Sequence, residues 1–358
     1  ASSLKSLVCK GLGLQYCGVP FTLIINLGDD RVEFQYEMSE FPETSIFGDV
    51  TGTINLNWGE LFHGAITVGR KSWEDVYYHP FYSEQEVYFR YFMMRTFIKN
   101  HNGKIYISEA YKTLDPSEKG AINYFIGCTF TKIIAEKLFE TSWLMHLDVY
   151  QRRLYGNEDL RVAYYGNDNS RPDFIGVNYS KNFNVFESKG RVKFYSTVLD
   201  KAKAQCNNVK TINGKCPEWK IACLTFHNEE NFKMIVKDPQ KYGKNAIDLK
   251  IDLDDFFLDY YALIFNFIHR SKYNLIKIKN LDFYLTNDKC ENFSIGMEKG
   301  LFDLIKETRY NRETFLKRFK GIFPSFKTLK FQAQNFNKNS KNIYIGGDGI
   351  FVKVHDVY

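Results

Sequence analysis

Apolar residues in the first hundred positions gather in short runs that favour β-structure, followed by one longer helical pattern. The runs at residues 21–27, 31–38 and 52–57 are rich in β-forming side chains, whereas residues 84–99 carry apolar positions at helical spacing. We therefore predict an N-terminal α+β domain over residues 1–114, with a role in recognition, regulation or assembly.

The clearest helix start lies at Asp115-Pro116-Ser117-Glu118. Asp115 can cap the helix, Pro116 suits its first turn, and Glu118 stands three residues after the cap, which is the spacing of a capping box. The pattern predicts a helix that runs to about Glu140.

The pattern after this helix predicts an α-β-β-β-α-β core over residues 115–240. Strand-like runs are followed by a helix at 196–207 and a further strand at 220–226; the runs lie at 143–150, 160–165, 173–177 and 183–189. We expect a third, basic α+β region over residues 241–358, with a helix at 252–269 and a hairpin at 345–350. The fold class is thus an α/β core within a chain that is α+β overall.

One hairpin of this core carries candidate chemistry. A tight polar turn at residues 179–182 joins the strand that begins at Asp173 to the strand that ends in Glu187-Ser188-Lys189. Because side chains alternate along a strand, Glu187 and Lys189 project together, and hairpin pairing can bring Asp173 beside them.

Two carboxylates and an amine suit phosphodiester hydrolysis, because hard carboxylate oxygens bind Mg²⁺ while water and phosphate complete the octahedron. We expect Mg²⁺, for which Mn²⁺ can substitute. The backbone carbonyl of Ser188 is a further candidate ligand. Lys189 would orient or deprotonate the attacking water, or neutralise the phosphate.

Pro172-Asp173, thirteen intervening residues and Glu187-Ser188-Lys189 together resemble the motif of the PD-(D/E)xK nuclease superfamily. The resemblance covers roughly residues 115–230. It implies a restriction-endonuclease-like core, a DNA substrate, Asp173 and Glu187 as metal ligands, and Lys189 as the catalytic lysine. The alternative is a solvated cross-strand charge pair of Glu187 and Lys189 beside an ordinary turn.

Two helical residues are additional candidates. Some members of the superfamily place a further acid on the helix before the hairpin, which makes Glu136 a candidate ligand; an exposed i,i+4 pair with Lys132 is the alternative. On the following helix, Gln205 can reach a phosphate.

Composition narrows the class of protein. Hydrophobic residues make up 44% of the 358-residue chain and aromatic residues 17%, which excludes disorder over most of its length. Neither a membrane span nor a secretory leader is visible, so we expect a cytoplasmic protein without membrane contact. Seven scattered cysteines without a C-x-x-C pair argue against a disulfide framework or a zinc site.

The net charge of +6 is unevenly distributed. Residues 301–341 hold ten Lys and Arg against three acids, whereas residues 29–49 hold seven acids and one Arg. We expect the basic region to contact nucleic acid, while most of its phenylalanines belong to the core. The candidate contacts are Arg312, Lys317, Arg318 and Lys320.

These observations predict a Mg²⁺-dependent deoxyribonuclease, in restriction or another anti-phage defence, or alternatively in DNA repair or mobile-element processing. A non-catalytic nucleic-acid-binding or complex-assembly protein that retains a nuclease fold is the alternative from another class. A homodimer or a protein partner in a larger complex would suit cleavage of both strands. The defence role rests on analogy of fold.

Overall fold

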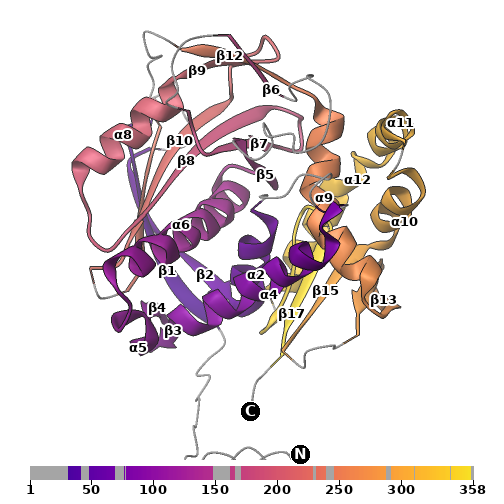
Figure 1. Cartoon of the computed structure of the whole chain (residues 1–358), viewed down its shortest axis with the longest axis horizontal. Helices are drawn as coiled ribbons and strands as arrows, with labels where there is room; N and C mark the ends of the chain where they lie inside the picture. The colour runs from indigo at the N-terminus through magenta and orange to yellow at the C-terminus, as the bar shows by residue number, and fades with distance from the viewer. Residues whose placement is uncertain are drawn as a thin grey trace, which may run out of the picture.

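A computed structural model of the chain shows a mixed α/β protein (Figure 1). It describes residues 31–41, 48–68, 76, 78–147, 162–165, 171–228, 231–238, 246–287, 292–309, 311–338 and 340–355. The strand predicted at residues 21–27 lies outside these ranges.

A nine-stranded mixed sheet forms the centre of the molecule. Eight strands follow one another in the order β3-β4-β1-β11-β10-β8-β7-β5, and β2 pairs with β1 at the side. Their bounds are β1 (Arg31–Ser39), β2 (Val50–Asn57), β3 (Ile98–His101), β4 (Lys104–Ile107), β5 (Trp143–His146), β7 (Phe174–Val177), β8 (Phe183–Arg191), β10 (Trp219–Phe226) and β11 (Lys233–Lys237).

Two helices cover opposite faces of this sheet at β8 and β10, α6 (Pro116–Leu138) on one side and α8 (Ser196–Asn207) on the other (Figure 1). The start of α6 confirms the predicted cap, because the Asp115 side chain accepts the N–H groups of Ser117 and Glu118, and Glu118 reaches back to the Asp115 N–H. The bounds of α8 agree with the prediction.

Along the chain, α6, β5, β7, β8, α8 and β10 follow in this order with two strands of another sheet inserted, and β5, β7, β8 and β10 are neighbours in the central sheet. β5, β7 and β8 pair antiparallel, and α8 provides the crossover from β8 to the parallel strand β10. One predicted strand does not belong here. β6 (Val162–Tyr165) pairs with β12 (Ile247–Ile251), in a three-stranded sheet with β9 (Val209–Ile212).

A close backbone contact fixes α6 on β8. A Cβ added to Gly190 would lie 1.7 Å from the carbonyl oxygen of Asn123, and one added to Gly127 would lie 2.9 Å from the Gly190 nitrogen. Only glycine allows the helix to approach the strand this closely. Gly190, which follows Lys189, thus allows α6 to pack directly on the end of β8.

The central sheet extends across the predicted boundary at residues 114 and 115. β11 joins the two parts, since it pairs with β10 on one side and with β1, in parallel, on the other. A single apolar cluster includes Val32 near one end of the chain, Phe186 in the middle and Val354 near the other end.

The C-terminal part is built on a five-stranded sheet with the order β13-β14-β15-β17-β16. The predicted helix at 252–269 is present as α9, capped by Asp252, and the predicted hairpin is formed by β16 and β17. The bounds are β13 (Tyr273–Ile278), β14 (Leu281–Thr286), β15 (Phe293–Glu298), β16 (Ile343–Ile345), β17 (Ile350–Val354), α9 (Leu253–Arg270), α10 (Lys299–Thr308), α11 (Arg312–Ile322) and α12 (Ser325–Asn337).

The described residues before α6 also contain the helices α2 (Trp58–Thr67), α4 (Pro80–Phe97) and α5 (Glu109–Lys112). α4 corresponds to the helix predicted at 84–99 and begins four residues earlier, because Pro80 occupies its first turn without losing a needed N–H. α2 packs against α6, α4 and β17, so it links the C-terminal sheet to the central one.

Candidate functional site

Asp173 and Glu187 meet where the β7–β8 ladder ends. The last strand pair is Phe174 with Phe186, which leaves Asp173 and Glu187 opposite each other. The Asp173 N–H donates to Glu187 Oε2 at 2.7 Å, and the Ser188 N–H donates to Asp173 Oδ2 at 3.0 Å. Each carboxylate thus accepts a backbone N–H from the neighbouring strand, which holds the two acids together.

Lys189 completes this group. Its ammonium donates a hydrogen bond to Glu187 Oε1, and this contact becomes an ion pair when Glu187 is ionised. The side chain of Glu187 is 0% exposed and that of Lys189 is 20% exposed, so the pair extends from the interior towards the surface. The three residues predicted as the catalytic group are therefore in contact at one end of the hairpin.

The environment of Glu187 disfavours its charge. Burial and the neighbouring carboxylate of Asp173 raise the pKa of Glu187 to about 8, although Lys189 and the Asp173 N–H act in the opposite direction. A carboxyl group with this pKa carries a proton at neutral pH. A divalent cation placed between the two acids would take the place of that proton.

Ser188 offers its backbone and not its side chain. The Ser188 hydroxyl contacts α6 and not the two acids, because it accepts a hydrogen bond from the Thr131 hydroxyl at 3.0 Å. In the continued register Ser188 lies opposite Pro172, which has no N–H to donate to the Ser188 carbonyl. The proline before Asp173 therefore cannot form the ladder bond to this carbonyl.

The α8 side of the site contains Gln205 and Cys206. Gln205 Nε2 donates to the carbonyl of Arg171 at 2.8 Å and so holds the segment that leads into Asp173. Burial, followed by the charges of Glu187, Cys223 and Asp173, raises the pKa of the Cys206 thiol well above its ordinary value. Cys206 is thus a neutral packing residue, and Gln205 positions the acid-bearing segment.

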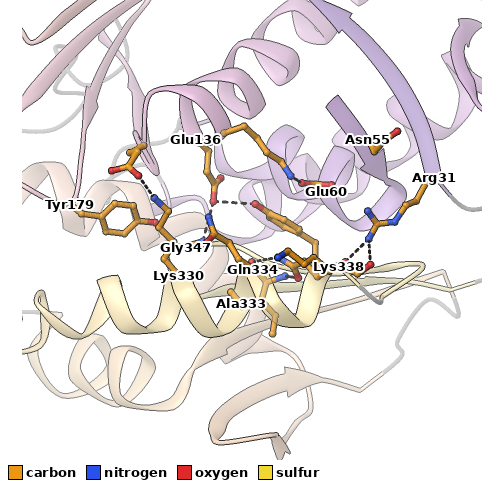
Figure 2. Close-up of a pocket in the computed structure, with 15 residues that line it drawn as sticks. Arg31, Asn55, Glu60, Glu136, Tyr179, Lys330, Ala333, Gln334, Lys338 and Gly347 are labelled. Atoms are coloured by element: carbon orange, nitrogen blue, oxygen red, sulfur yellow. Dashed lines mark hydrogen bonds and ion pairs between the residues drawn. The ribbon is translucent and has the colours of Figure 1, made fainter. Parts of the chain in front are cut away.

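Glu136 belongs to a different cluster. It lies in the wall of a cavity of about 430 Å³ between α6, α12 and β16 (Figure 2). The Tyr344 hydroxyl and the Gly347 N–H donate to Glu136 at 3.2 and 3.0 Å, and Lys132 donates to it at 3.3 Å. The i,i+4 pair with Lys132 therefore exists, with Lys132 fully buried, and it is engaged with the C-terminal hairpin.

A buried polar network next to Glu136 was not predicted. His63 Nε2 lies 3.1 Å from both carboxylate oxygens of Asp348, and the Tyr260 hydroxyl donates to Asp348 at 2.5 Å. Burial alone would raise the pKa of Asp348, but the partner His63 leaves it below its ordinary value. These side chains come from α2, α9 and the turn between β16 and β17, so no local sequence pattern marks them.

The basic residues predicted for nucleic acid lie on α11. Arg312 pairs with Asp255 at 2.8 Å and Arg318 with Glu307 at 2.6 Å, while Lys317 and Lys320 are exposed. The prediction that most phenylalanines of this region are core residues is confirmed for those with at most 4% exposure: Phe302, Phe315, Phe319, Phe323 and Phe326. Phe331, at 66% exposure, differs.

The described residues hold neither a larger cluster of metal-ligating side chains nor a membrane-spanning helix. No group of three or more His, Cys, Asp or Glu side chains arranged for a metal occurs in the ranges given above. Free thiols are present at Cys128, Cys206, Cys216 and Cys223. Among the helices that the structure describes, none combines the length and apolar character needed to cross a bilayer.

Comparison with protein-family models, with curated proteins and with solved structures found no match.

Proposed function

We propose that this protein is a Mg²⁺-dependent nuclease that hydrolyses phosphodiester bonds in DNA at Asp173, Glu187 and Lys189. The observation that carries the proposal is the contact between these three side chains at the end of the β7–β8 hairpin. The hairpin lies within the order α6-β5-β7-β8-α8-β10, with the four strands adjacent. This arrangement resembles the core of the PD-(D/E)xK superfamily.

The residues fit a hard divalent cation. Asp173 and Glu187 supply carboxylate oxygens, and Ser188 supplies a carbonyl that Pro172 cannot engage. Mg²⁺ prefers one or two carboxylates and keeps several waters, so further protein acids are not required. The raised pKa of Glu187 agrees with this fit, since its buried carboxyl lies beside that of Asp173 and Lys189 compensates only part of the charge.

When bound, Mg²⁺ would lower the pKa of a coordinated water and stabilise charge on the phosphate. Lys189 carries the remaining chemistry. The Lys189 side chain is more accessible to solvent than that of Glu187. Released from Glu187 by the cation, its ammonium would orient the attacking water or neutralise the phosphate.

A non-catalytic role is supported by one observation. Glu187 and Lys189 already satisfy each other, as a buried structural ion pair would. In that case the chain would bind nucleic acid or a protein partner without cutting it.

Cleavage of supercoiled, linear and single-stranded DNA by the purified chain, with Mg²⁺, with Mn²⁺ or with EDTA, tests the proposal. Asp173→Asn and Lys189→Ala should each reduce the cleavage rate by at least about 100-fold. Matched controls are Asp200→Asn and Lys210→Ala, which change exposed residues on α8 and β9.

Metal-dependent cleavage that persists in Asp173→Asn would refute the proposed centre. A wild-type chain that binds DNA but never cuts any of the three forms would favour the non-catalytic role.

A further inference from the structure

The segment directly after the proposed catalytic strand is basic and aromatic. Residues 191–195 read Arg-Val-Lys-Phe-Tyr and begin two positions after Lys189. The side chains of Phe194 and Tyr195 are 41% and 52% exposed, and Arg191 and Lys193 are exposed as well. Two adjacent rings and two cations thus face solvent next to the site.

This segment is held in place at three points. The Val192 carbonyl accepts the N–H groups of His227 and Asn228 at 3.3 and 2.7 Å. The Phe194 ring lies 5.7 Å from that of Phe226 at the end of β10. Tyr195 then occupies the cap position of α8. The exposed rings are therefore presented by a fixed backbone, which lowers the entropic cost of binding.

The position of the segment follows from strand geometry. Arg191 lies on the same face of β8 as Glu187 and Lys189, and alternate residues of a strand are roughly 6.6 Å apart. Tyr195 comes six residues after Lys189, so its Cα lies at most about 22 Å away. A nucleic acid strand engaged at Lys189 can therefore continue over this surface.

The exposed rings of α4 lack this combination with exposed cations. Phe81, Tyr82, Phe89 and Phe92 on α4 are at least 48% exposed. However, Arg90 of that helix is buried and Arg95 stacks over Trp58 at 4.5 Å. The 191–195 segment combines exposed rings with exposed cations, which is the composition that binds unpaired nucleic acid.

We propose that the 191–195 segment binds an unpaired DNA strand, with bases stacked on Phe194 and Tyr195 and phosphates neutralised by Arg191 and Lys193. As a specificity surface this rests on the proposed nuclease function, because it directs single-stranded or frayed DNA to Lys189. In a duplex the base faces are covered by their neighbours, so the two rings discriminate between the forms.

Binding in EDTA tests this inference without cleavage. Fluorescence anisotropy measures the full-length chain on a short labelled single strand, on the same sequence in a hairpin duplex and on the RNA equivalent. The variant Phe194→Leu with Tyr195→Leu keeps apolar bulk but removes both ring faces. Tyr195→Leu alone preserves the packing of Phe194, and Tyr82→Leu on α4 is the control at a ring that is more exposed, at 69% against 52% for Tyr195.

The double variant should bind the single strand about 5- to 150-fold more weakly for each stacked base lost, and the duplex within about twofold of wild type. Lys193→Ala should lower the slope of log affinity against log salt by about 0.7 for the single strand. Tyr82→Leu should leave both affinities unchanged.

Single-strand affinity unchanged in the double variant and in Tyr195→Leu, or reduced equally by Tyr82→Leu, would overturn the inference. Tighter binding of RNA than of DNA would overturn the assignment to DNA. Failure of the nuclease proposal appears separately, as ring-dependent binding by a chain that does not cleave when Mg²⁺ is added.

Discussion

Glu187→Gln should stabilise the protein in the absence of metal while abolishing its activity. Glutamine has nearly the shape of a protonated glutamic acid, and it can still accept the Asp173 N–H. The substitution therefore preserves the folded state that the raised pKa of about 8 implies at neutral pH. The variant side chain cannot ionise, whereas in the wild type the Glu187 carboxyl ionises mainly in the unfolded chain.

The size of the effect follows from proton linkage. Between the ordinary pKa of 4.5 and the folded value of about 8, the unfolded chain releases the Glu187 proton and the folded chain keeps it, so wild-type stability falls as the pH rises. The difference between variant and wild type should be near zero below pH 4.5. It should reach about 3 kcal/mol at pH 7 and level off at about 5 kcal/mol above pH 8.

Urea unfolding in EDTA at pH 5, 7 and 9 measures this difference. For a chain of 358 residues, about 3 kcal/mol corresponds to a rise of about 4 °C in the midpoint of thermal unfolding. Glu313→Gln removes an exposed carboxylate from α11 and should change stability by less than about 0.5 kcal/mol. A gap that does not grow with pH, or a less stable Glu187→Gln chain, would show that Glu187 is an ionised partner of Lys189.

Three further predictions use the same structure. Because Glu187 must lose its proton to bind a cation, the Mg²⁺ concentration for half-maximal cleavage should fall about tenfold for each pH unit up to about 8 and then remain constant; a flat profile measured by metal titration would contradict this. Asp348→Asn should lower the free energy of unfolding, measured in urea, by about 3–5 kcal/mol, because the buried His63 loses its carboxylate partner. A loss of less than about 1 kcal/mol would show that this carboxylate does not stabilise the fold. Gly190→Ala should disrupt the packing of α6, since its Cβ would meet Asn123, whereas Gly120→Ala, with open space around it, should stabilise the helix by about 0.4–1 kcal/mol; calorimetry compares the two.

Local patterns predicted the elements that carry the site. The capping box at Asp115 and the helix at Ser196 are encoded by neighbouring residues, and the β7–β8 hairpin follows from its short turn. These features depend on contacts between residues close in sequence, so a single sequence contains the information. The convergence of Asp173 with Glu187 follows from the hairpin alone.

Pairings between distant residues were beyond such patterns. β6 has the composition of a strand but joins β12, about 85 residues later, because nothing in a strand sequence names its partner. The contact of His63 with Asp348 joins residues 285 positions apart. The Gly-Gly-Asp-Gly stretch at 346–349 is a turn, as expected, but the burial of its aspartate depends on α2 and α9.

The parallel pairing of β1 with β11, which sets Gln35 beside Lys233, has a consequence for how the chain reaches its native state. On the ribosome, the β1–β2 hairpin emerges long before β11. The pairing of β1 with β11 can therefore form only after nearly two hundred further residues have been synthesised. Such non-local topology slows folding and leaves an open strand edge prone to aggregation. A fragment limited to residues 115–240 would expose the edge of β11 that β1 covers. Recombinant studies of the β7–β8 hairpin are therefore best made on the intact polypeptide.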